Sequence, residues 1–207
     1  MQNNRQNVAE NVQNKTARHF SATAAHEGDD GFPVIGISLA VGGPEIFMDI
    51  LGNIPNPSSK AILLATNVAN SVDIALLRNL IDPTGLTVVT ATDGLAVRPG
   101  QVHIIPPTSY VSVTNDCFMV TRPYPGEQVR FPLDVLFASV AREYASRAIG
   151  IMAPGAGQDG IIGLQSIRER GGLSIAGLAA DATDTPRFAI GAGDADNVVS
   201  ADRIGLA

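Results

Sequence analysis

The sequence predicts an α/β protein with a doubly wound, mainly parallel sheet and an antiparallel edge hairpin. Short runs rich in branched apolar residues are typical of strands that are buried on both faces. These runs occupy residues 33–39, 60–66, 86–92, 148–154 and 173–179. Segments of helical period separate them, and residues 133–145 are the clearest example. The apolar face of that segment comprises Leu133, Leu136, Phe137, Val140 and Tyr144.

One stretch, residues 101–123, breaks the alternation of strand and helix. It lacks helical periodicity, and apolar residues alternate with polar ones on either side of the turn signal Asn115-Asp116. We therefore expect an antiparallel hairpin at the edge of the sheet. His103 lies within this stretch in an apolar run, which is typical of a packed or edge-exposed strand histidine rather than a catalytic one.

Composition limits the possible function. With 207 residues, of which 45% are hydrophobic and 16% charged, the chain can bury one sizeable core. A net charge of −6 argues against nucleic acid as a partner. The single cysteine, Cys117, excludes an internal disulfide, and no metal-ligand spacing surrounds it, so we expect neither metal nor cofactor. We find no signal peptide and no run of membrane-spanning length, which predicts a soluble cytoplasmic protein.

The first residues of the chain differ from the rest. Residues 1–31 are rich in Asn and Gln and contain few large apolar side chains, which predicts a flexible or separately docked tail. The change in composition at Phe32 indicates that one domain occupies residues 32–207.

The segment "GFPVIGISLAVGGPE" carries an apolar strand into a glycine pair at the expected start of a helix. α/β enzymes place a nucleophile at such a turn, but here the tip contains Ala40 and Val41. Two roles are open for Gly42 and Gly43. They allow the helix to pack closely on the strand, or their exposed N–H groups hold an anion or carboxylate.

Sequence blocks that follow in order carry a family resemblance. They are "FPVIGISLAVGGPE", "ATDGLAVRPGQVHIIPP", "FPLDVLFASVA", "RAIGIMAPGAGQDGIIGLQSIRERGG" and "DTPRFAIGAGDAD". From Phe32 to about residue 200 the chain resembles the CheB-type methylesterase domain of bacterial chemotaxis, particularly the version fused to a receptor methyltransferase. The resemblance implies an enzyme fold that hydrolyses glutamate methyl esters on receptor helices with a serine, a histidine and an aspartate, in cytoplasmic signal transduction.

The resemblance also assigns the catalytic positions. It places Ala40 where the family has its serine, and Asn67 is the best equivalent of the histidine. Asp159, in "GAGQDG", matches the aspartate that orients the histidine. Because alanine and asparagine supply neither a nucleophile nor a base, we expect the serine-hydrolase cycle not to start.

Two of these positions have alternatives. Ser38 becomes a possible nucleophile if the turn carries extra residues, although no histidine is at hand to activate it. Asp159 precedes a helical run, so capping that helix explains it without catalysis. The candidate ligand-binding residues, several of them with a packing role as the alternative, are Ser38, Val41, Gly42, Gly43, Ala156 and Arg187.

Three functions follow as hypotheses. The first is a degenerate methylesterase homologue that acts as a binding or regulatory module for a protein partner, either chemoreceptor-like helices or a signalling protein. The second is an active hydrolase that uses Ser38 or an acid pair. The third is a structural assembly subunit that oligomerises through its tail. We expect no receiver domain before Phe32, because the residues ahead of it are too few to fold as one.

Overall fold

The computed structural model describes residues 31–39, 43–66, 74–126, 128–153, 158–178 and 197–200. The larger sheet in these residues is wholly parallel, with the strand order β3-β4-β2-β1-β7-β8-β9. Its strands are β1 (Val34–Leu39), β2 (Ala61–Thr66), β3 (Thr87–Thr90), β4 (Gln101–Ile105), β7 (Ala148–Met152), β8 (Leu173–Leu178) and β9 (Asn197–Ser200). A second, antiparallel sheet consists of β5 (Tyr110–Thr114) and β6 (Cys117–Thr121).

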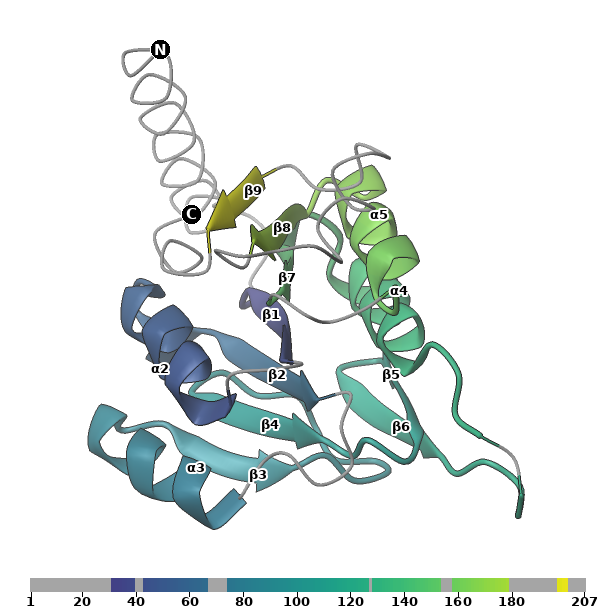
Figure 1. Cartoon of the computed structure of the whole chain (residues 1–207), viewed down its shortest axis with the longest axis horizontal. Helices are drawn as coiled ribbons and strands as arrows, with labels where there is room; N and C mark the ends of the chain where they lie inside the picture. The colour runs from purple at the N-terminus through teal and green to yellow at the C-terminus, as the bar shows by residue number, and fades with distance from the viewer. Residues whose placement is uncertain are drawn as a thin grey trace.

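Helices cover both faces of the parallel sheet (Figure 1). The helices are α2 (Gly43–Asn53), α3 (Ile74–Ile81), α4 (Pro132–Tyr144) and α5 (Ile161–Glu169), and short 3-10 turns lie at Pro57–Ser59, Asp82–Thr84 and Ala145–Arg147. One apolar cluster joins the sheet to α2 and α3. The other joins it to α4, α5 and the β5–β6 hairpin. The doubly wound α/β architecture expected from the sequence is therefore confirmed.

The central strand β1 shows how the two faces are divided. All of its residues are buried. Ile35, Ile37 and Leu39 belong to the cluster on the α2–α3 side. Because side chains alternate along a strand, Gly36 and Ser38 face α4 and α5.

The elements predicted from apolar patterns are present. Each of the five expected runs contains a parallel strand. The predicted apolar face of residues 133–145 is buried throughout, on α4. The antiparallel hairpin is confirmed as β5–β6, and Asn115 and Asp116 have φ of 52° and 56° as a tight two-residue turn requires.

The start of the hairpin differs from expectation. Gln101–Ile105 was expected within it, but these residues form β4, which pairs in parallel with β2 and β3 inside the large sheet. The two prolines that follow it lack the N–H groups needed to continue a ladder, so β4 ends at Ile105. The hairpin itself forms a separate two-stranded sheet held on α4, where the Val113 N–H donates to Ser139 Oγ at 2.9 Å.

Glycines let α4 and α5 lie close to the sheet. Gly36 and Gly150 are paired across β1 and β7. A Cβ on Gly36 would lie 2.7 Å from the Phe137 ring, and one on Gly150 would lie 2.6 Å from side-chain carbons of Leu164 and Ile167. These separations are shorter than van der Waals contact, so the side chains of α4 and α5 that lie over these glycines would have to shift to accept even a methyl group.

The direction of winding reverses between β1 and β7. α2, which follows β1, covers one face of the sheet, whereas α5, which follows β7, covers the other. In open α/β sheets the crevice for ligands forms at the carboxyl ends of the strands at such a reversal. The fold therefore directs attention to the residues that follow β1, β2 and β7.

We predict that Gly150→Ala destabilises the protein by about 1–3 kcal/mol, because the added methyl group would overpack the contact between β7 and the side chains of Leu164 and Ile167 on α5. Gly52→Ala is the matched control, since nothing lies within 4 Å of a Cβ built at this position in α2. That change should stabilise the fold by roughly 0.5–1 kcal/mol through helix propensity. Urea denaturation measures both. Equal effects of the two substitutions would show that close packing is not the reason for Gly150.

Candidate functional site

Two of the positions singled out in the sequence directly follow the carboxyl ends of neighbouring strands. Leu39 pairs with Thr66 at the ends of β1 and β2, so Ala40 and Asn67 each follow a residue of the same pair. Ser38, Gly43 and Asp159 are described by the structure. Outside the described residues lie Ala40, Val41, Gly42, Asn67, Ala156 and Arg187, together with the tail at residues 1–30.

The Asp159 carboxylate closes the first turn of α4. Its Oδ1 accepts the N–H groups of Leu133 at 3.0 Å and Asp134 at 3.1 Å, and its Oδ2 lies 3.2 Å from the Leu133 nitrogen. Capping was expected from the sequence, but of the helix that follows Asp159, which is α5. The capped helix is α4, because α4 and α5 begin side by side and the carboxylate reaches across to the neighbouring N-terminus.

Asp134 makes the reverse contact. Its Oδ1 accepts the N–H groups of Gly160 at 3.0 Å and Gly163 at 2.8 Å, which lie at the start of α5. Asp134 within α4 therefore caps α5, and Asp159, just before α5, caps α4. Neither helix has a side-chain hydrogen bond from its own N-cap residue, Phe131 in α4 and Gly160 in α5. The reciprocal caps replace those local bonds.

The two carboxylates also shape the electrostatics of this corner. Burial raises the pKa of the Asp159 carboxyl, and the nearby charge of Asp134 acts in the same direction. The hydrogen bonds from the backbone N–H groups of Leu133 and Asp134 act in the opposite direction, because they favour the charged form of Asp159. The net result is a pKa above the ordinary value of an aspartate. Asp159 is thus a half-buried acid whose charge is directed at a helix N-terminus.

Ser38 lies on β1 with none of its surface exposed. Its Oγ has no hydrogen-bond partner among the described residues. His103 stands on the same face of the sheet but two strands away, on β4, which corresponds to about 10 Å across the ladder. Ser38 is therefore out of reach of that imidazole as a base.

His103 is a packed strand histidine. Its ring lies against Phe118, with centroids 5.0 Å apart, and its Nε2 accepts the Arg98 N–H at 3.3 Å. Burial lowers the pKa of His103 to about 4. The ring is neutral at physiological pH and packs against its neighbours. Of the two positions expected from the sequence, packed or edge-exposed, the structure has the packed one.

Among the residues that the structure describes, no group of three or more His, Cys, Asp and Glu side chains is placed to hold a metal ion. No helix in the described part of the chain is long and apolar enough to cross a membrane.

Comparison with known proteins identifies the family. The family model described as CheB methylesterase matches residues 34–207. The chain belongs to the CheB methylesterase family. Its fold agrees with that of the Thermotoga maritima CheB methylesterase catalytic domain, at a TM-score of 0.69 and 26% identity over 84% of this chain and 96% of that one.

Curated CheB relatives are similar in sequence over most of the chain. The protein-glutamate methylesterase FrzG of Myxococcus xanthus is 31% identical over 85% of this chain and 54% of its own length. Protein-glutamate methylesterase/protein-glutamine glutaminase 3 of Anaeromyxobacter dehalogenans is 33% identical over 83% of this chain and 51% of its own. The chain thus spans about half the length of these relatives.

The sequence analysis did not single out Asp134 or Phe131. A signal for Asp134 exists, since it lies two residues after Pro132, the first residue of α4. Proline at the first helical position and an acid in the first turn are typical of a helix start. What the sequence does not contain is the partner of that acid, which lies on another helix.

We predict that Asp159→Ala destabilises the protein by about 1–2 kcal/mol, because two N–H groups at the start of α4 lose their acceptor. Asp159→Asn keeps an acceptor oxygen and should lose less. Urea denaturation of the two variants and of Asp134→Ala measures the contributions. An unchanged stability of Asp159→Ala would contradict the capping role.

We predict a pH dependence of stability that originates from His103. Its folded pKa of about 4 lies below the unfolded value of 6.5, so between these pH values the unfolded state binds the proton preferentially. Stability should be full above pH 6.5 and fall by up to about 3 kcal/mol as the pH approaches 4. His103→Gln should flatten this part of the curve. Parallel curves for the two proteins, measured by urea denaturation at several pH values, would exclude His103 as the source.

Proposed function

We propose that this CheB-family protein is a non-hydrolytic binding or regulatory module that engages a protein partner without turning it over. The observation that carries the proposal is the set of groups at the three catalytic positions given by the family resemblance. Two of them hold Ala40 and Asn67, which supply no nucleophile and no general base.

The third position supports the same conclusion. Asp159 keeps its residue type, and its carboxylate accepts hydrogen bonds from two N–H groups of α4. Helix capping therefore accounts for an aspartate at this position without a histidine to orient. The retained residue is not, by itself, evidence of retained catalysis.

A hydrolase that uses Ser38 is the main alternative. The burial of Ser38 within β1 counts against it, because a protein-borne ester cannot reach a hydroxyl that lacks exposed surface. The distance to His103 counts against it as well, since a serine without a base in hydrogen-bond reach is a weak nucleophile. No described contact favours the third possibility, a structural subunit assembled through the tail.

The partner is proposed from the relatives. FrzG is named a protein-glutamate methylesterase, and the Anaeromyxobacter protein is named a methylesterase and a protein-glutamine glutaminase. A module that retains their fold would recognise a segment bearing glutamate or glutamine side chains, on chemoreceptor-like helices or on a signalling protein. Action in the cytoplasm is part of this proposal.

We predict that the protein releases neither methanol from glutamate methyl esters nor ammonia from glutamine side chains above a heat-denatured control. Loss of the nucleophile or base of a serine hydrolase costs on the order of 10⁶ in kcat, which places any residual rate below detection. Methylated receptor membranes and a methyl-ester peptide serve as substrates, and a serine-directed fluorophosphonate followed by mass spectrometry tests labelling of Ser38.

Ala40→Ser alone should not restore turnover, because the new hydroxyl still lacks a base. Ala40→Ser combined with Asn67→His is the smallest change that rewrites the triad. Hydrolysis by the unmodified protein that Ser38→Ala abolishes would overturn the proposal and establish Ser38 as the nucleophile.

A further inference from the structure

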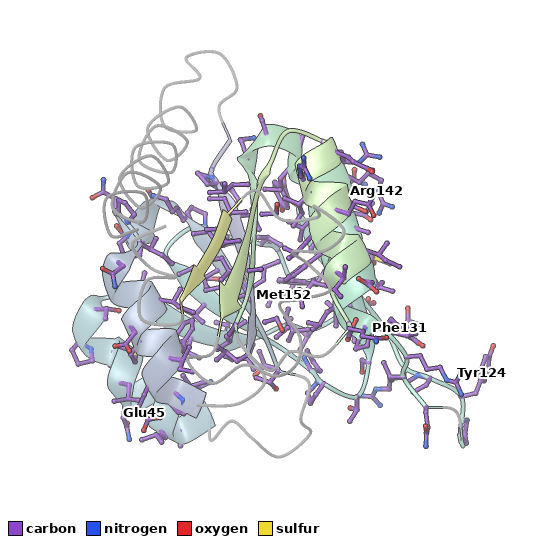
Figure 2. The ribbon with its side chains drawn as sticks, turned by 45° about the horizontal axis from the view of Figure 1, so that its top comes forward. Glu45, Tyr124, Phe131, Arg142 and Met152 are labelled. Carbon is purple, nitrogen blue, oxygen red and sulfur yellow. The ribbon has the colours of Figure 1, made fainter. Side chains whose placement is uncertain are left out.

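The large sheet ends at β3, and among the described residues no strand pairs with the outer side of β3. Helices cover both faces of this sheet, with Glu45 of α2 on one side and Arg142 of α4 on the other (Figure 2). Backbone groups that the ladder leaves unpaired are therefore found at the edges of the sheet. β3 forms one of these edges and lies at the lower margin of the sheet, away from β9 (Figure 1).

The hydrogen bonds of β3 determine which of its backbone groups point outward. The N–H groups of Thr87 and Ala91 donate to carbonyls on or next to β4, at 3.0 and 2.9 Å. Because the backbone groups of successive residues in a strand point in opposite directions, those of Val89 also face β4, whereas the N–H and C=O groups of Val88 and Thr90 face outward. The Thr90 side chain is exposed and Val89 is half-buried, so the outer edge is open to solvent.

β3 also lacks the features that usually block an open edge, which are charged side chains, prolines and bulges. β6 shows one such feature, because its Val120 N–H donates to the Asp93 carboxylate at 2.9 Å instead of to another strand. The four residues of β3 are Thr, Val, Val and Thr, with no charge and no proline. The edge is therefore suited to pair with a further strand.

The outward groups are symmetric about Val89. When two copies of β3 lie antiparallel with Val89 beside its own counterpart, Val88 of each copy faces Thr90 of the other. These are hydrogen-bonded pairs, in each of which the two residues exchange both of their N–H···O bonds. The two Val89 residues then form a non-hydrogen-bonded pair, where β-branched side chains pack closely across strands. The edge is thus complementary to itself, as a two-fold interface requires.

We propose that two copies of this chain associate through β3, antiparallel about a two-fold axis at Val89, to give one continuous sheet. Two copies with a net charge of −6 each repel one another, and β3 adds no charge to that repulsion. Because the strands of the two copies run in opposite directions, the carboxyl edges of their sheets face away from each other. The pairing therefore covers neither candidate site, and it does not depend on whether the protein hydrolyses esters.

Sedimentation velocity of the full-length protein over a range of concentrations tests the association. The sedimentation coefficient should rise with concentration toward that of a dimer of 21.5 kDa chains. Thr90→Pro removes an outward N–H from each copy and should weaken dimerisation by about tenfold or more. Urea denaturation should show little loss of stability in this variant, because that N–H does not pair with β4. Thr90→Ala is the matched control, since it keeps the N–H, and should weaken dimerisation far less.

Val89 tests the register without reliance on the proline variant. Val89→Lys and Val89→Glu should each abolish self-association, because like charges would meet directly opposite each other at the two-fold axis. An equimolar mixture of the two variants should associate again, since opposite charges then meet. A mixture that stays monomeric would show that Val89 does not face its own counterpart and would overturn the proposed pairing.

Amide hydrogen exchange distinguishes the possible occupants of the edge. The N–H groups of Val88 and Thr90 should exchange slowly at high protein concentration and rapidly at low concentration. Rapid exchange at every concentration would leave the edge open for a strand of another protein. Slow exchange in a monomer would assign it to a segment of the same chain. Either result, or dimerisation that Thr90→Pro and the Val89 variants leave unchanged, would exclude a second copy at β3.

Discussion

The close approach of α4 and α5 to the parallel sheet is the constraint on which the rest of this region depends. Gly36 on β1 and Gly150 on β7 allow this approach because they have no side chain toward the helices. Gly163 does the same within α5, where a Cβ would lie 2.5 Å from the Cβ of Phe137 on α4. At this separation the carboxylate of each aspartate reaches the first turn of the neighbouring helix. The glycines therefore determine electrostatics as well as packing, although they carry no charge.

The same constraint places one aspartate in two possible roles. The family resemblance gives Asp159 the task of orienting a histidine, while the structure shows it accepting hydrogen bonds from Leu133 and Asp134. A carboxylate has several lone-pair positions, so capping and catalysis are compatible on chemical grounds. Because capping alone accounts for an aspartate at this position, the residue type there is not by itself evidence of activity.

Local patterns predicted the fold well where burial follows a simple period. The parallel strands and the apolar face of α4 are encoded by runs and spacings that lie within each element. The pairing of Gln101–Ile105 was mistaken because a strand buried in a sheet and the first arm of a hairpin have the same local pattern. The helix capped by Asp159 was mistaken because helix termini that adjoin in space are distant in sequence. Phe131 was missed because its left-handed backbone conformation leaves no trace in the residue pattern.

The exchanged caps have a consequence for the kinetics of folding. Leu133 and Asp159 are separated by 26 positions, so the first turn of α4 acquires its acceptor only after β7 and the start of α5 are in place. Helices of 13 and 9 residues are marginal on their own, and here both lack a local side-chain cap. We therefore expect each helix to gain its cap from contacts that are distant in sequence, and α4, β7 and the start of α5 to become stable together during folding.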